Sequence, residues 1–211
     1  MSDFAKLTSA HYLIDKYDAE EATKRINKKV KDTGYEVASI TKGTAHYKNN
    51  KGNHVVSLKG TNPLNVKDLI SDFKLGVGLQ HHDEQFKGRK KAVKAIYKTI
   101  PDKETINLTG HSLGGSVATN VLAESGSIRD RTKKAHLFNT GYTKKFHNSL
   151  STNLDSDERK LLNKKITHHH NTTDIISKDL QAGSIGSVNK YKDTEVKGVL
   201  EKHGLDQFID A

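Results

Sequence analysis

The amino-acid sequence predicts an α/β fold in which a mixed, mostly parallel central sheet is flanked by helices. From residue 83 onwards, segments with the apolar spacing of helices alternate with the short apolar runs of strands. Strand, sharp turn, helix and strand follow one another here, an order that implies parallel pairing with helical crossovers. An antiparallel hairpin is predicted earlier in the chain, so the sheet is expected to be mixed.

The N-terminal part is predicted to contain a helix and that hairpin. Residues 8–31 have apolar residues at fourfold spacing, and Asp18 with Glu21 has the pattern of a capping box, which leaves a break near Asp18 open. The segments YEVASITKGTAHYK and HVVSLKG, residues 35–48 and 54–60, are predicted strands. The NNKGN between them supplies the Asn and Gly that a tight turn requires.

The remainder alternates helices and strands. Residues 83–100 form an amphipathic helix with one lysine-rich side. ETINLTG (104–110) is a predicted strand, LGGSVATNVLAE (113–124) a buried helix and KKAHLFNTG (133–141) another strand. The segment ITHHH (166–170) is predicted to be a further strand.

Length and composition predict one soluble domain, residues 1–211, that folds without an obligate protein partner. There is no apolar run of about 18 residues to span a membrane, and the acidic N-terminal segment is unlike a signal peptide. The absence of cysteine excludes disulfides, thiolate metal sites and cysteine nucleophiles. These features do not indicate the cellular compartment of the protein.

The formal net charge of +10 favours association with phosphates, in nucleic acid or on an anionic membrane surface. A solvated lysine-rich surface is the simpler interpretation. We do not expect a nucleic-acid partner, because the sequence has no recognition motif and its aromatic residues are not interleaved with the basic groups.

The segment INLTGHSLGGSVATNVLAE, residues 106–124, places Ser112 between Gly110 and Gly114. In a nucleophile elbow, a serine occupies a strained strand-to-helix turn, and glycines two residues to either side let strand and helix pass closely. The helix that begins at Leu113 directs free N–H groups toward the site, so the Leu113 amide is an expected oxyanion donor. A structural Gly-Ser turn is the alternative, but the predicted strand and helix on either side favour a nucleophile.

TGHSLGGSVA resembles the elbow of the class 3 (fungal-type) lipases, which have the α/β-hydrolase fold, and the likeness runs from about residue 35 to residue 208. HVVSLKGTNPLNVKDLISDF is similar to the family's strand that ends in Phe-Arg-Gly-Thr and precedes a short helix with an Asp. The resemblance implies that Thr61 is the second oxyanion donor. LQHHDEQF resembles the family's His-x-Gly-Phe segment but lacks its glycine. Residues 74–84 leave room for only a reduced lid, and whether this segment moves is open.

The resemblance also implies the rest of a catalytic triad, in the order Ser, acid, His. Asp174 in ITHHHNTTDIISKDL resembles the family's acid position, with Asp179 as the second candidate. His203 in EKHGLDQF matches the family's late His segment.

Five other histidines are given structural roles. The run of three histidines at residues 168–170 suggests a metal site, but without a nearby carboxylate pattern a plain strand is the preferred interpretation. His82 and His111 are expected to pack or to support the site. No metal or cofactor is expected.

These residues predict a serine carboxylic-ester hydrolase of lipase or phospholipase type, which cleaves acyl esters of lipids through an acyl-enzyme. A short lid and a basic surface favour a soluble ester or an anionic phospholipid over a triglyceride droplet. The alternatives are a small-ester esterase, a thioesterase or a non-catalytic lipid-binding protein on the same scaffold. Acyl-chain, headgroup and positional preference, oligomeric state and source are left open.

Overall fold

The computed structural model describes residues 2–61, 83–141, 144–152, 154–174, 184–191 and 203–209. Within these ranges, seven strands form one sheet in which the spatial order follows the sequence. The strands are β1 (Glu36–Ile40), β2 (Thr44–Lys48), β3 (Asn53–Leu58), β4 (Thr105–His111), β5 (Thr132–Phe138), β6 (Ile166–Asn171) and β7 (Ser187–Tyr191). The first three are antiparallel, and every later pair is parallel, so the prediction of a mixed, mostly parallel sheet is confirmed.

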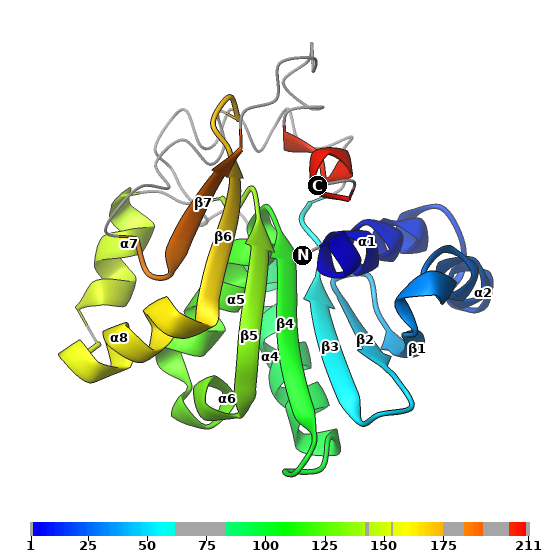
Figure 1. Cartoon of the computed structure of the whole chain (residues 1–211), viewed down its shortest axis with the longest axis horizontal. Helices are drawn as coiled ribbons and strands as arrows, with labels where there is room; N and C mark the ends of the chain where they lie inside the picture. The colour runs from blue at the N-terminus through cyan, green and yellow to red at the C-terminus, as the bar shows by residue number, and fades with distance from the viewer. Residues whose placement is uncertain are drawn as a thin grey trace.

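Helices lie on both faces of this sheet (Figure 1). The α-helices are α1 (Ser2–His11), α2 (Ala19–Lys29), α4 (Asp83–Thr99), α5 (Leu113–Glu124), α6 (Gly126–Arg131), α7 (Lys144–Ser151) and α8 (Ser156–Lys165). Short 3-10 helices are η1 (Tyr12–Asp15), η2 (Lys31–Thr33) and η5 (Asp206–Phe208). None of the helices in the described ranges is both long and apolar enough to cross a membrane.

The alternation of side chains along β3 separates two cores. Val55 packs with Leu7 and Ile26 of α1 and α2, whereas its neighbour Val56 packs with Val93 and Val117 of α4 and α5. Successive residues of a strand point to opposite faces of the sheet, so Val55 packs against one layer of helices and Val56 against the other. The sheet is therefore covered by α1 and α2 on one face and by α4 and α5 on the other.

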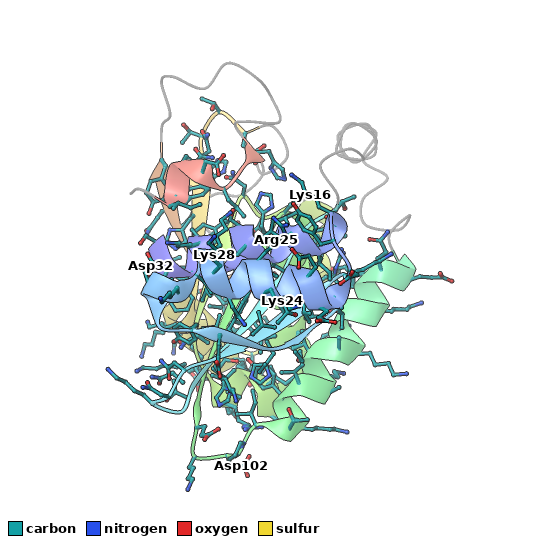
Figure 2. The ribbon with its side chains drawn as sticks, turned by 90° about the vertical axis from the view of Figure 1, so that its right-hand side faces the viewer. Lys16, Lys24, Arg25, Lys28, Asp32 and Asp102 are labelled. Atoms are coloured by element: carbon teal, nitrogen blue, oxygen red, sulfur yellow. The ribbon has the colours of Figure 1, made fainter. Side chains whose placement is uncertain are left out.

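The outer face of α2 carries exposed cations (Figure 2). Lys24 and Arg25 form ion pairs of 2.8 and 2.6 Å with Glu20 and Glu21, one turn earlier in the helix. Exposed pairs at this spacing stabilise a helix by a few tenths of a kcal/mol. The cations on this face of α2 therefore lie on a solvated surface.

Two predicted elements are each divided into two in the structure. The helix expected over residues 8–31 begins at Ser2 and is interrupted between α1 and α2; the break near Asp18 is confirmed, since its carboxylate caps α2 by accepting from Glu21 N–H at 2.9 Å. The single strand expected over residues 35–48 is two strands, β1 and β2. The Thr41 hydroxyl accepts hydrogen bonds from the backbone N–H groups of Gly43 and Thr44, which closes a turn that apolar spacing does not reveal.

The strands predicted around residues 104–110 and 166–170 are confirmed as β4 and β6. The hairpin turn is also as expected, because the Asn49 side chain accepts from the Lys51 and Asn53 amides, and Gly52 has a φ of +69°. The strand predicted over residues 133–141 ends earlier, at Phe138, because Asn139 has a φ of +41°.

Burial lowers the pKa of seven histidines of the described residues below the ordinary value: His11, His46, His111, His136, His168, His169 and His170. The pKa falls to about 3 for His11, His111 and His169 and to about 4 for His46, His136 and His168. These histidines are therefore neutral in the folded protein at neutral pH, and folding opposes their protonation.

We predict that the protein is sensitive to acid. An unfolded histidine has a pKa of about 6.5, so below this pH the unfolded chain binds protons that the folded chain excludes. The stability is complete above about pH 6.5 and falls as the pH decreases toward the folded pKa values of about 4 and 3. Each histidine costs on the order of 2 kcal/mol between about pH 7 and pH 5.

Chemical unfolding at a series of pH values measures this loss. The slope of the free energy of unfolding near pH 5.5 should correspond to about five or more protons taken up on unfolding. A free energy of unfolding that stays constant over this range would contradict the burial of neutral histidines.

Candidate active site

Ser112 connects β4 to α5 in a backbone conformation that is rare for a residue with a side chain. Its φ is 54° and its ψ is −124°. The Ser112 N–H donates to the Phe138 carbonyl at 3.0 Å, and the Ser112 carbonyl accepts from the Gly115 and Gly141 amides at 3.0 and 3.2 Å. Hydrogen bonds to α5 and to the end of β5 therefore hold the strained turn in place.

Two glycines allow the turn to be this sharp. A Cβ atom on Gly114 would lie 2.1 Å from the Leu58 carbonyl oxygen, and one on Gly110 would lie 2.8 Å from the Gly114 carbonyl oxygen. Helix α5 thus crosses the end of β3 with backbone against backbone. A side chain at either position would meet backbone atoms, so the close approach requires glycine at both.

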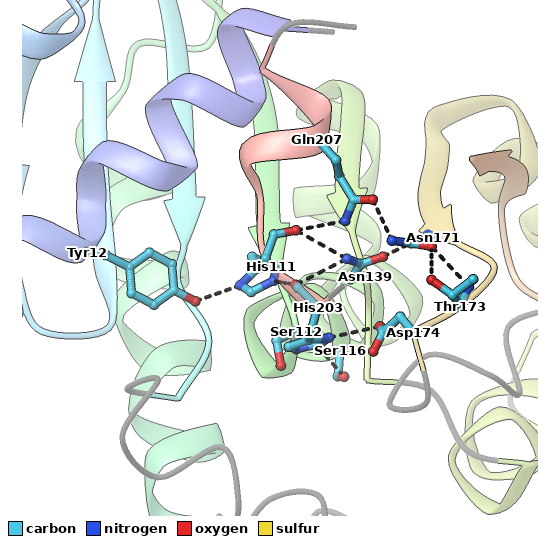
Figure 3. Close-up of polar contacts among 11 residues, drawn as sticks. Tyr12, His111, Ser112, Ser116, Asn139, Asn171, Thr173, Asp174, His203 and Gln207 are labelled. Atoms are coloured by element: carbon cyan, nitrogen blue, oxygen red, sulfur yellow. Dashed lines mark hydrogen bonds and ion pairs between the residues drawn. The ribbon is translucent and has the colours of Figure 1, made fainter. Parts of the chain in front are cut away.

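Asp174 and His203 form a buried pair close to this turn. His203 Nδ1 lies 2.8 Å from Asp174 Oδ2, and their side chains are 3% and 0% exposed. Asp174 follows β6, where its N–H donates to the Asn171 carbonyl at 2.9 Å. In Figure 3, the His203 side chain lies between Ser112 and Asp174. The second candidate acid, Asp179, lies outside the described residues.

Ser112 and His203 each have a side-chain atom without a hydrogen-bond partner among the described residues. These atoms are Ser112 Oγ and His203 Nε2, and both are buried. With Asp174 on Nδ1, the remaining ring nitrogen of His203 is the one available to take a proton. Hydrogen bonds between such groups are often long before substrate binds.

The two expected oxyanion donors are Leu113, directly after Ser112, and Thr61, directly after Gly60. Leu113 opens α5, so its N–H has no partner within the helix. Thr61 follows Gly60, whose backbone passes so close to the elbow that an added Cβ would lie 2.8 Å from Ser112 Cβ. The Thr61 hydroxyl is buried and has no partner within the described ranges.

A chain of hydrogen bonds runs from Gly60 to the backbone of His203. The Gly60 N–H donates to the Tyr12 hydroxyl at 2.8 Å, and Tyr12 Oη lies 2.7 Å from His111 Nδ1. His111 Nε2 lies 2.6 Å from the His203 carbonyl oxygen and must be its donor. Burial, with the nearby His203, lowers the pKa of His111 to about 3, so the ring is neutral and Nδ1 accepts from Tyr12. Figure 3 follows this chain from Tyr12 to His111.

Asn139 fixes the same carbonyl from another side. Its Nδ2 donates to the carbonyl oxygens of His203 and Gly204 at 3.1 and 3.3 Å, and its Oδ1 accepts from the Asn171 N–H at 2.9 Å. Sequence reasoning anticipated a supporting role for His111 but missed Tyr12 and Asn139. The sequence does place Asn139 directly after a predicted strand. Asparagine tolerates positive φ, and its side chain can bridge backbone groups, so this position could have indicated its role.

The remaining predicted residues lie apart from this site or outside the described ranges. The strand β6 that contains the three histidines is as expected; His168 contacts Thr140 Oγ1 at 3.0 Å and the Ile185 carbonyl at 2.9 Å. Among the described residues, no group of three His, Asp or Glu side chains could hold a metal ion. His82 and residues 74–82 of the proposed lid are not described, and residues 83 and 84 begin α4.

The structure is similar to that of the lipase from Rhizopus microsporus var. chinensis, with a TM-score of 0.53 and 14% identity over 92% of this chain and 74% of the lipase. A mutant form of MDLA from Penicillium cyclopium has a TM-score of 0.49 and 16% identity over 93% of this chain and 80% of its own. A fungal lipase has a TM-score of 0.49 and 17% identity over 94% of this chain and 82% of its own. No protein-family model and no curated protein matches the sequence. The chain has the fold of a fungal-type lipase, an α/β-hydrolase fold, as the sequence predicts.

We predict that Gly114→Ala destabilises the folded state by about 3 kcal/mol or more, because the added methyl group meets the Leu58 backbone, which cannot move aside within the sheet. Urea unfolding measures this change. Gly88→Ala in α4 is the matched control, since its added Cβ meets no atom within 4 Å. Alanine there should stabilise the helix by up to about 1 kcal/mol. Equal stabilities of the two variants would contradict the proposed backbone crossing.

Proposed function

We propose that this protein is a serine carboxylic-ester hydrolase of lipase or phospholipase type. The observation that supports this proposal best is the buried pair of His203 and Asp174 beside Ser112, a serine with positive φ at a strand-to-helix turn. An ordinary Gly-Ser turn requires neither a buried carboxylate nor a histidine with a free ring nitrogen. The lipase-like fold is consistent with this chemistry but does not by itself establish it.

In the first step, Ser112 Oγ attacks the carbonyl carbon of an ester while its proton passes to His203 Nε2. The Asp174 carboxylate holds Nδ1–H and stabilises the imidazolium that forms. The carbonyl oxygen becomes an oxyanion and accepts hydrogen bonds from the amides of Leu113 and Thr61. His203 then returns the proton to the departing alcohol, which leaves an acyl group on Ser112.

In the second step, water releases the acid. His203 Nε2 accepts a proton from the water as its oxygen attacks the acyl carbon, and the same amides stabilise the second oxyanion. The proton then returns to Ser112 Oγ, which is the leaving group. Burial lowers the pKa of His111 to about 3, so His111 stays neutral and is not expected to take up a proton during this cycle.

We expect a lipid or another acyl ester as substrate and no obligate protein partner. Hydrolysis of p-nitrophenyl esters of increasing chain length, beside release of fatty acid from phospholipids, distinguishes an esterase from a lipase or phospholipase. Hydrolysis of a series of thioesters tests the thioesterase alternative. A protein that binds lipid without cleaving any of these substrates would be the non-catalytic scaffold.

We predict that Ser112→Ala abolishes ester hydrolysis and leaves the fold intact. The matched control is Ser57→Ala: the Ser57 hydroxyl is also buried and without a partner among the described residues, but it lies within β3. This control should keep kcat within about twofold of the wild type. Circular dichroism and ester release on all three proteins measure fold and activity. Turnover by pure Ser112→Ala would refute the assignment of the nucleophile.

We predict that Tyr12→Phe lowers kcat by about 10-fold with little change in KM, because His111 and the Gly60 amide lose the hydroxyl that links them. Tyr97→Phe is the matched control, since it also removes a buried tyrosine hydroxyl, here 2.8 Å from Thr132 Oγ1. Both variants should lose about 1–2 kcal/mol of stability. Only the Tyr12 variant should lose kcat, and an equal kcat in the two variants would show that Tyr12 serves the fold alone.

A further inference from the structure

A pocket of about 440 Å³ lies beside the proposed oxyanion loop, between the β1–β2 turn and α4. The residues that give it chemical character are Asp15, Lys42, Lys59, Thr61 and Arg89. Its volume is within the range of small-ligand sites, and Thr61 belongs both to the pocket and to the proposed oxyanion hole. A group bound here would therefore lie next to an ester held at Ser112.

The pocket carries an excess of positive charge. It contains three cations and one carboxylate, and Asp15 is already paired with Lys59 at 2.7 Å. Lys59 is 3% exposed, so this pair is a fixed part of the wall. Within the described part of the chain, neither Lys42 nor Arg89 forms an ion pair with a carboxylate, although Asp15 lies near enough to act on the charge of Arg89. Lys42 lines the pocket and is exposed.

Arg89 is a buried cation with unused hydrogen-bond donors. Its side chain is packed against Gly43, where an added Cβ would lie 2.9 Å from both Cγ and Nε of Arg89. Nη2 donates to the Gly60 carbonyl at 3.3 Å, whereas Nε and Nη1 are buried and have no partner among the described residues. A buried charge with unpaired donors is costly unless an anion completes it. The residue is 7% exposed, so solvent does little to offset that cost.

We propose that this pocket is a phosphate-binding subsite that takes the phosphate on the alcohol side of the ester substrate. The assignment rests on the proposed ester hydrolase activity and narrows the substrate class to acyl esters of phosphate-bearing alcohols. A phosphate offers several oxygens that can accept from Arg89, from Lys42 and from the unpartnered Thr61 hydroxyl together. Arg89 would also couple the subsite to catalysis, because it holds the Gly60 carbonyl directly before Thr61.

Binding is tested on the Ser112→Ala protein with inorganic phosphate as the probe, followed by ³¹P NMR and calorimetry. We expect saturable binding that weakens about 10-fold in Lys42→Gln and by more in Arg89→Met. Lys42 is exposed, so Lys42→Gln is expected to fold as the parent protein does. This variant therefore tests the subsite even if Arg89→Met disturbs folding. The matched control is Lys94→Gln, an exposed lysine of α4 outside the pocket lining, which should bind phosphate as tightly as the parent protein.

The source of the phosphate is tested with active protein. The ratio of kcat/KM for a lysophosphatidylglycerol to that for a monoacylglycerol with the same acyl chain should fall about 10-fold in Lys42→Gln and stay unchanged in Lys94→Gln. Phosphate binding that depends on Lys42, together with an unchanged ratio, would support a site for free phosphate and overturn its role in substrate selection.

Absence of saturable phosphate binding, or equal binding in the Lys42, Arg89 and Lys94 variants, would overturn the subsite. This test of phosphate binding does not depend on whether the protein hydrolyses esters. If the wild type hydrolysed no ester, the proposed function would fail, whereas the titration of Ser112→Ala would still decide whether the pocket binds phosphate.

Discussion

The arrangement of the site depends on the crossing of α5 over the end of β3. Gly114 and the Leu58 carbonyl are so close there that no side chain fits between them. This contact brings the N-terminus of α5 against the loop that contains Gly60 and Thr61. Ser112 must then turn sharply between β4 and α5, which accounts for its positive φ. The backbone crossing therefore places the proposed nucleophile and both proposed oxyanion donors at one point.

Polar groups on distant elements place the histidine. The carbonyl of His203 is contacted by His111 Nε2 and by Asn139 Nδ2, while its ring is held by Asp174. Fixing a backbone carbonyl on two sides limits the positions that the imidazole can adopt. Because His111 is neutral, it can donate at Nε2 and accept from Tyr12 at Nδ1 in the same tautomer. Buried polar networks of this kind are stabilising only when every member is satisfied.

The sequence was most informative where the determining contacts are local. The spacing of Gly110 and Gly114 predicted the elbow because both glycines act within four residues of each other, and the turn at residues 49–53 was predicted for the same reason. The additional turn at residues 41–43 was missed, since it depends on a threonine hydroxyl rather than on apolar spacing. The contact of Tyr12 with His111 spans 99 residues, and no local pattern indicates which side chains a fold will bring together over that distance.

Covalent labelling with a fluorophosphonate is the most direct test of whether Ser112 is an activated nucleophile. Attack of the serine oxygen on phosphorus expels fluoride and takes its place, and His203 removes the serine proton. The account predicts one adduct per chain, located by mass spectrometry on the peptide that contains Ser112 and reduced to background in His203→Ala. A folded protein that forms no adduct, or one labelled equally at other serines, would contradict the account.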